Sequence, residues 1–116
     1  MDERSEEIND LVRTDRIKIT AVVATYNEEH HIGQCLMSLL SQRGVDGEVE
    51  ILVVDGMSRD RTVDIVRSFP EYGTRIRLIQ NPRRLQVYAW NAALQEARGK
   101  YFAMILAHSE YGPTYF

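Results

Sequence analysis

The chain has 116 residues, a length that suits one globular domain and not two. Its hydrophobic content of 44% is enough to form a core. No run of 18 apolar residues occurs and no apolar segment lies near the N-terminus, which argues against a membrane span and a secretory signal. The single cysteine excludes an internal disulfide, and we expect Cys35, on an apolar helical stripe, to be buried. These features predict a cytosolic location.

The formal net charge of −3 is concentrated in residues 1–16, which hold six acidic and three basic side chains. Residues 17–116 carry 11 of each sign, so they offer no basic face for nucleic acid. We expect residues 1–16 to form an acidic leader, either flexible or a short helix, because Ile8, Leu11 and Val12 follow helical spacing.

The first two predicted elements are a strand and a helix joined by a polar turn. Residues 17–25 (IKITAVVAT) are nearly all apolar and rich in β-branched side chains, which is typical of a strand buried on both faces. Asn27 is a candidate cap for the helix, and Glu28 and Glu29 suit its positive N-terminal end. Apolar residues then recur at helical spacing: Ile32, Cys35, Leu36, Leu39 and Leu40.

Residues 50–55 (EILVVD) predict a second buried strand. We expect Asp60 to cap the next helix and Pro70 to help end it. The apolar residues of that helix are Val63, Ile65, Val66 and Phe69.

Two strands and one helix complete the pattern. Residues 75–80 (RIRLIQ) alternate in polarity and predict a third strand with one wetter face, near a sheet edge. Residues 87–98 predict a helix that Gly99 ends, and residues 101–106 (YFAMIL) predict the fourth strand.

Strands and helices alternate along the chain, which predicts an α/β fold. We expect an open, mainly parallel sheet of four strands alternating with three helices, which cover both faces. The chain ends shortly after the fourth strand, which would leave a bare sheet edge. We therefore expect residues 17–116 to be the front half of a larger domain, with self-association through that edge as a possible consequence.

Polar side chains follow the first two strands at their carboxyl ends, the edge where open α/β sheets bind ligands. Glycine-rich phosphate motifs are absent, and Glu28 and Glu29 would repel a diphosphate placed at the helix start. A nucleotide would therefore present its base and ribose to this edge. Asp55 and Glu28 can accept hydrogen bonds from an imide N–H or from ribose hydroxyls, and Tyr26 offers a ring face.

The diphosphate of such a ligand needs positive charge from elsewhere. Arg84 is one candidate, and a divalent cation at the end of the fourth strand, near His108, is another. Asp55 and Arg84 can also have purely structural roles. Asp55 can simply cap the turn that follows it, and Arg84 can be a solvated loop charge.

Three motifs together, YNEE, VVDGMSRDRT and ARGKY, resemble the donor-binding half of family 2 glycosyltransferases. The resemblance covers roughly residues 17–115 and is closest to the succinoglycan and exopolysaccharide biosynthesis branch. It implies the GT-A fold, a Rossmann-like nucleotide-binding arrangement.

The resemblance also implies roles for individual residues. Thr25, Tyr26, Glu28 and Asp55 would bind the nucleoside of a UDP- or GDP-sugar. In this family the fourth strand ends in Asp-x-Asp, or in Asp-Ala-His in the branch that this chain resembles, and the last position helps bind Mn²⁺ or Mg²⁺. By this resemblance His108 is the metal ligand.

The chain departs from the family pattern at the metal motif, which reads Leu106-Ala107-His108. Leu106 replaces the first carboxylate. An imidazole alone is a poor ligand for Mg²⁺ and a better one for Mn²⁺. The sequence therefore predicts weakened metal binding.

By the same resemblance, the parent reaction is inverting transfer of a sugar from a nucleotide-diphospho-sugar to a saccharide or lipid-linked acceptor. The family's general base and acceptor half lie downstream, so no catalytic residue is carried over, and we expect little or no turnover by this chain alone. The alternatives are a non-catalytic nucleotide-binding or interaction module with a degenerate metal motif, and a structural fragment that needs a partner to fold. A longer parent could lie at the cytoplasmic face of the inner membrane.

Overall fold

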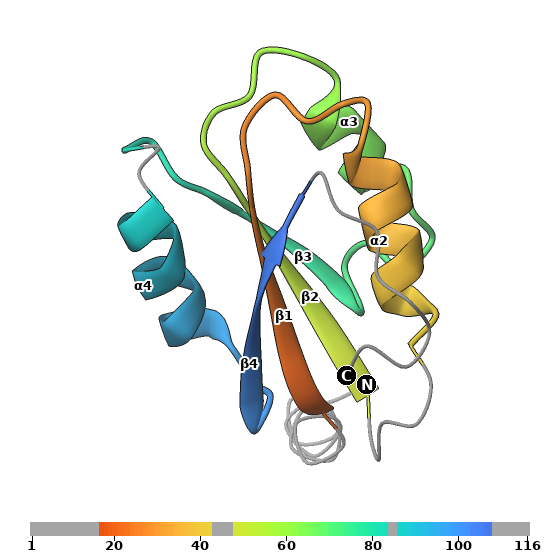
Figure 1. Ribbon diagram of the computed structural model, residues 1–116, viewed down its shortest axis with the longest axis vertical. Helices are drawn as coiled ribbons and strands as arrows, with labels where there is room; N and C mark the ends of the chain where they lie inside the picture. Colours follow the sequence, from red (N-terminus) through yellow and green to blue (C-terminus); the bar gives the residue numbers. More distant parts are fainter. Residues whose placement is uncertain (1–16, 43–47, 84–85, 108–116) are drawn as a thin grey trace, which may run out of the picture.

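The computed structural model describes residues 17–42, 48–83 and 86–107, which form a parallel sheet between two helical layers (Figure 1). The predicted leader, residues 1–16, lies outside the described residues. The strands are β1 (Ile17–Thr25), β2 (Glu48–Asp55), β3 (Ile76–Gln80) and β4 (Tyr101–Leu106). Their order in the sheet is β3-β2-β1-β4, and all neighbours pair in parallel. The predicted α/β fold with an open parallel sheet is confirmed.

The helices of the described part cover both faces of the sheet, as predicted. They are α2 (Ile32–Leu40), α3 (Thr62–Arg67) and α4 (Gln86–Glu96). Figure 1 shows α2 and α3 together on one face and α4 on the other. No helix in the described ranges is both long enough and apolar enough to cross a membrane.

Two apolar clusters fill the space between these layers because successive strand side chains point to opposite faces. On the α2 side, the buried helix residues Cys35, Leu36 and Leu39 pack with strand residues of β1 and β2: Ala21, Val23, Val49, Ile51 and Val53. On the α4 side lies a smaller cluster of Val22, Leu52, Val54, Ala89 and Ala93. The expected burial of Cys35 is confirmed, since its side chain is fully enclosed.

The third strand lies at one sheet edge, as its alternating sequence predicts, and β4 forms the other edge. On β4, Ile105 is buried, whereas the larger side chains at the edge are exposed: Tyr101, Phe102, Met104 and Leu106. The prediction of self-association through this edge is not tested by the fold and stays a prediction.

The predicted helix starts differ from the observed ones. Helix α2 begins at Ile32, after an N-cap at His31 that makes no side-chain capping bond, so the prediction that Asn27 caps it is wrong. Asn27 instead adopts a left-handed conformation (φ 51°), which asparagine tolerates better than most residues. Its side chain has a different partner, described below. Helix α3 is also shorter than predicted, ending at Arg67.

Candidate functional site

The carboxyl ends of β1, β2 and β3 lie next to one another. Asp55, the last residue of β2, pairs with Thr25 on one side and with Gln80 on the other. The ladder continues past the strands, where the Gly56 N–H donates to the Thr25 carbonyl at 2.8 Å and the Asn81 N–H to the Asp55 carbonyl at 2.7 Å. Thr25 and Asp55, which sequence analysis placed in one site, are therefore direct neighbours.

A pocket of about 280 Å³ opens at this edge, on the α4 side of the sheet. Tyr26 stands at it with 40% of its surface exposed, so its ring is available to a planar ligand. The full lining consists of Ala24, Thr25, Tyr26, Val54, Gly56, Asn81 and Ala89. Two predicted site residues, Thr25 and Tyr26, therefore contribute to a concave surface.

Thr25 has an unusual polar atom. The residue is only 6% exposed, and its Oγ1 has no hydrogen-bond partner among the described residues. A buried hydroxyl without a partner is destabilising, because folding removes its bonds to water and replaces them with nothing. This hydroxyl is therefore a group that a ligand or a bound water at the pocket could satisfy.

The carboxylate of Asp55 is completely buried and is held by the turn that follows it. Ser58 donates to it twice, from its N–H to Oδ2 at 2.9 Å and from its Oγ to Oδ1 at 2.5 Å. These contacts match the alternative interpretation of Asp55 as a turn-capping residue. An ionised carboxylate can accept about four hydrogen bonds, so the two from Ser58 leave capacity for a ligand donor.

The loop between β1 and α2 is fastened to the loop between β2 and α3. The Asn27 N–H donates to Ser58 Oγ at 2.9 Å, and the Asn27 side-chain oxygen accepts from the Arg59 N–H at 2.8 Å. Because Ser58 Oγ also bonds Asp55, a continuous chain of hydrogen bonds runs from Asn27 to the carboxylate at the end of β2. Asn27 and Ser58 therefore join the two loops.

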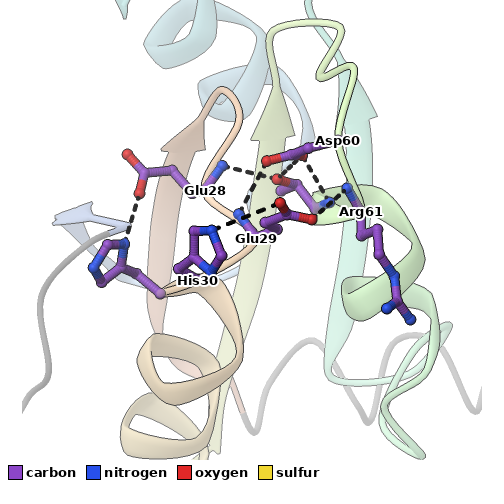
Figure 2. A network of polar contacts seen from close by, with 7 residues as sticks. Glu28, Glu29, His30, Asp60 and Arg61 are labelled. Atoms are coloured by element: carbon purple, nitrogen blue, oxygen red, sulfur yellow. Dashed lines mark hydrogen bonds and ion pairs between the residues drawn. The ribbon is translucent and has the colours of Figure 1, made fainter.

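Three further hydrogen bonds strengthen this connection, and Figure 2 shows them from close by. The Glu28 N–H donates to Thr62 Oγ1 at 2.8 Å, and the Glu29 N–H donates to Asp60 Oδ2 at 3.2 Å. In return, the Arg61 N–H donates to Glu29 Oε2 at 3.2 Å. We call residues 26–31 and 56–62, which these five bonds join, the paired loops.

Asp60 is placed at the start of α3, close to its predicted capping role. Its Oδ1 accepts from the N–H of Thr62 at 2.9 Å and from the Thr62 hydroxyl, although the N-cap position itself is Arg61. Burial opposes ionisation of Asp60, but the hydrogen bonds from Thr62 and from the Glu29 N–H outweigh it and lower the pKa of this carboxyl. The charged form of Asp60 therefore stabilises the paired loops.

Glu28 lies beside the site but not in the pocket lining. Its carboxylate is 3.4 Å from His31 Nδ1, and in Figure 2 it points away from Asp60 and Arg61. Burial, and then the charge of Glu28, raise the pKa of the Cys35 thiol to about 12, so this thiol stays protonated at neutral pH. The nucleoside-binding role of Glu28 stays a prediction, whereas the inert character expected of Cys35 agrees with its environment.

The two residues predicted to contact the diphosphate or its metal ion are Arg84 and His108. Arg84 and His108 lie outside the described residues, so their roles stay predictions. Arg83 is described, and its guanidinium stacks 4.6 Å from the centre of the Tyr88 ring at the start of α4. At the end of β4, the side chain of Leu106 is aliphatic and 49% exposed, and it cannot ligate a cation. In the described ranges no three His, Cys, Asp or Glu side chains gather as a metal site.

Sequence analysis missed five pocket residues: Ala24, Val54, Gly56, Asn81 and Ala89. Asn81 follows the third strand, so the argument that polar residues at strand ends form sites could have included it. Ala89 carries no such signal, because its position depends on how α4 packs against β2.

Comparisons with known proteins agree with this architecture. The profile of the family described as Glycosyl transferase family 2 matches residues 20–116. Among curated proteins, a Methanococcus voltae glycosyltransferase, dolichyl N-acetyl-alpha-D-glucosaminyl phosphate 3-beta-D-2,3-diacetamido-2,3-dideoxy-beta-D-glucuronosyltransferase, is 33% identical over 93 residues. That match covers 78% of this chain and 29% of the relative.

Two solved structures share the fold. The crystal structure of Staphylococcus aureus TarS, residues 1–349, superposes with a TM-score of 0.74 at 27% identity, covering 84% of this chain and 29% of that one. A mannosyltransferase from Pyrobaculum calidifontis, in complex with GDP-Man and Mn²⁺, gives a TM-score of 0.72 at 30% identity, covering 85% of this chain and 30% of the other. TarS has also been solved with UDP-GlcNAc.

The chain therefore belongs to glycosyl transferase family 2, and its fold is the nucleotide-binding part of the GT-A architecture. It spans less than a third of the length of the relatives reported above. The family and the fold implied by the sequence motifs are confirmed.

Proposed function

We propose that this chain is the donor-binding part of a glycosyltransferase and that it binds a nucleotide-diphospho-sugar at the carboxyl edge of its sheet. The observation that carries the proposal is the pocket at this edge, which is lined by Thr25 and by the partly exposed Tyr26. The complexes of structural neighbours with UDP-GlcNAc and GDP-Man support the class of ligand.

In the proposed pose the nucleobase enters the pocket against the Tyr26 ring. Gly56 and Asn81 line the same space, and an asparagine amide is suited to hydrogen bonds with a base or ribose. Asp55 is not in the pocket lining and is fully buried, so in this proposal a donor of the base reaches its carboxylate only if the turn at Ser58 opens toward the pocket. The diphosphate then runs toward the end of β4, near Arg84 and His108.

The parent reaction in this proposal is transfer of the sugar, with inversion, to a hydroxyl of a saccharide or lipid-linked acceptor. The nucleoside diphosphate leaves as the acceptor oxygen bonds the anomeric carbon, and a general base takes the acceptor proton. None of the described residues is assigned that base. We expect little or no transfer by the 116-residue chain itself, and the cytosolic location stays part of the prediction.

Calorimetric titration of the chain with UDP and GDP, each with and without Mn²⁺, tests the proposal. Replacing Tyr26 with alanine should weaken nucleotide binding by roughly tenfold or more, the effect expected for losing one base-stacking ring. The matched control is Tyr72→Ala, which removes a similarly exposed tyrosine from the turn before β3 and should leave affinity unchanged. Absence of binding to either nucleotide, or equal losses in both variants, would contradict the proposal.

The second candidate, a nucleotide-binding module without transferase activity, is favoured by one observation. Leu106 removes a carboxylate from the position where the resemblance expects a metal ligand. Nucleotide binding that Mn²⁺ does not strengthen would support this candidate, whereas metal-enhanced binding would support a donor site of the transferase type.

A further inference from the structure

A buried carboxylate lies at the opposite end of the sheet from the pocket. Glu50, on β2, is only 3% exposed. Its Oε2 accepts from the Thr20 hydroxyl at 2.7 Å and from the Arg98 N–H at 2.6 Å, and its Oε1 accepts from Arg77 Nη2 at 2.8 Å. A charge is rarely buried in a strand interior unless it is paired and hydrogen-bonded, and both conditions are met here.

The partners of Glu50 connect it to the end of α4. Arg77 Nη2 also donates to the carbonyl of Glu96, the last helical residue, at 2.6 Å, which satisfies one of the free carbonyls at the helix C-terminus. Arg77 Nη1 lies 3.6 Å from the Glu96 carboxylate. Gly99, three residues later, donates its N–H to Thr20 Oγ1 at 2.9 Å. The whole segment 96–99 is thus held on β1, β2 and β3.

Gly99 lies so close to β1 that no side chain fits. A Cβ at this position would lie 2.6 Å from the backbone nitrogen of Thr20 and 2.7 Å from its Oγ1. Backbone atoms cannot move aside as a flexible side chain can, so the close approach requires glycine. The contact fixes where the chain crosses to the far sheet edge.

Strand β4 begins directly after this fixed segment, with Tyr101 opposite Ile19. A slip of one residue in this pairing would turn every β4 side chain to the other face and move the end of the strand. Because the link from Glu96 to Tyr101 is short, fixing Arg98 and Gly99 also fixes the pairing register of β4.

We propose that Glu50 is a positioning residue for the donor site. It anchors the end of α4 and the start of β4, and so sets where Ala89 lines the pocket and where the carboxyl end of β4 pairs with Ala24, another lining residue. Buried polar groups that fix register are an attested use of such pairs. The link to the donor site rests on the proposed function, whereas the effect on β4 does not.

Hydrogen exchange of the full 116-residue chain tests the proposal. In the Glu50→Leu variant, the amides of β4 should lose protection by on the order of tenfold or more, while those of Leu52 and Val54 in β2 retain theirs. Glu48→Leu is the matched control, since Glu48 is a less buried glutamate on the same strand. Equal protection of β4 in Glu50→Leu and in the control would overturn the proposal.

A double variant separates positioning from general stability. In Glu50→Leu/Arg77→Leu no charge is left buried without its partner, so the unfolding midpoint should recover relative to Glu50→Leu. The Arg98 N–H still lacks its acceptor, so β4 protection should stay low, and nucleotide affinity with it. Joint recovery of the midpoint and of β4 protection would show a purely structural role and overturn the proposal.

If Glu50→Leu does not fold, hydrogen exchange of the unaltered chain tests the proposal instead. The Arg98 and Gly99 amides bond only to side-chain oxygens in the contacts described here, and they should exchange as slowly as the amides of β4 because they open together. Fast exchange at Arg98 and Gly99 beside a protected β4 would overturn the proposal. Exchange needs no ligand, so failure of nucleotide binding by the unaltered chain would remove the proposed function and leave this test intact.

Discussion

The Asn27 side-chain oxygen accepts a hydrogen bond from the backbone N–H of Arg59, 32 residues further along the chain. Asn27 also has a positive φ, and its own N–H bonds Ser58. One residue thus supplies the backbone turn after β1 and two of the five bonds of the paired loops. Both properties contribute to stability and can be separated by substitution.

Asn27→Ala should lower the free energy of unfolding by about 1–2 kcal/mol, because alanine loses the side-chain bond and is strained at positive φ. Asn27→Gly should be less damaging, because glycine keeps the conformation and loses only the bond. Urea unfolding measures both. Met57→Gly is the control, since Met57 also has a positive φ (66°) and is exposed, and this change should be neutral or stabilising. Equal losses in Asn27→Ala and Asn27→Gly would show that the backbone conformation contributes nothing.

Thr25→Val should affect stability and nucleotide binding in opposite directions. Valine has nearly the same shape, and removing a buried hydroxyl without a partner should raise the free energy of unfolding by about 1 kcal/mol. If a nucleotide satisfies that hydroxyl, its affinity should fall at the same time. Thermal unfolding and calorimetry on the same variant give the two values. Destabilisation by Thr25→Val would indicate that the hydroxyl has a partner in the free protein.

Leu106→Asp should make nucleotide binding more dependent on Mn²⁺. The side chain is about half exposed at the end of β4, so a carboxylate is tolerated there and is available to a cation. Leu94→Asp is a matched control, because Leu94 is similarly exposed on α4. The measurement is UDP and GDP affinity with and without Mn²⁺. An identical metal response in both variants would show that the end of β4 does not contact the metal.

The paired loops should weaken in acid because of Asp60. Its pKa in the folded state is lowered, so the stabilisation that its charge provides is complete above the pKa of the unfolded chain and is lost as the pH falls through the folded value. Below about pH 5, Asp60→Asn should therefore lose less stability than the parent chain as pH falls. Asp64→Asn, a change at an exposed residue of α3, is the control. Parallel pH profiles for the parent and Asp60→Asn would contradict this assignment.

Cys35 should resist thiol reagents until the protein unfolds. The side chain is fully buried, and its pKa of about 12 keeps the thiolate fraction very small at pH 8. Reaction with a disulfide reagent should be slow in buffer and fast in denaturing urea. Rapid modification of the native chain would indicate that α2 opens locally.

The sequence was sufficient for the fold because two strands are continuous apolar, β-branched runs, β3 alternates in polarity, and α2 has a clear helical periodicity. The alternation in residues 75–80 even placed β3 at an edge. The assignment of Thr25 and Asp55 to one site followed from a general rule about parallel strands. Asn27 was misassigned because asparagine is favoured both at helix N-caps and at positive φ. The bonding partner that shows which role it has, Arg59, lies 32 residues away in the sequence.

The role of Glu50 was also beyond sequence reasoning. At the start of an apolar run it looks like a solvated charge, and its burial depends on Arg77, Thr20 and the end of α4, which come from three other elements. Ala89 is hidden for a similar reason, since an alanine in a helix has no chemistry to suggest that it lines a pocket. The burial of Glu50 and the position of Ala89 at the pocket both depend on contacts between elements that are far apart in the sequence.

The five bonds of the paired loops form within the protein itself, without a ligand. The part of the pocket lining that these loops supply, Tyr26 and Gly56, is thus held in place before the proposed nucleotide binds, and little ordering entropy should be lost on association. Association should then be a single encounter, with an observed rate that rises linearly with nucleotide concentration in stopped-flow experiments.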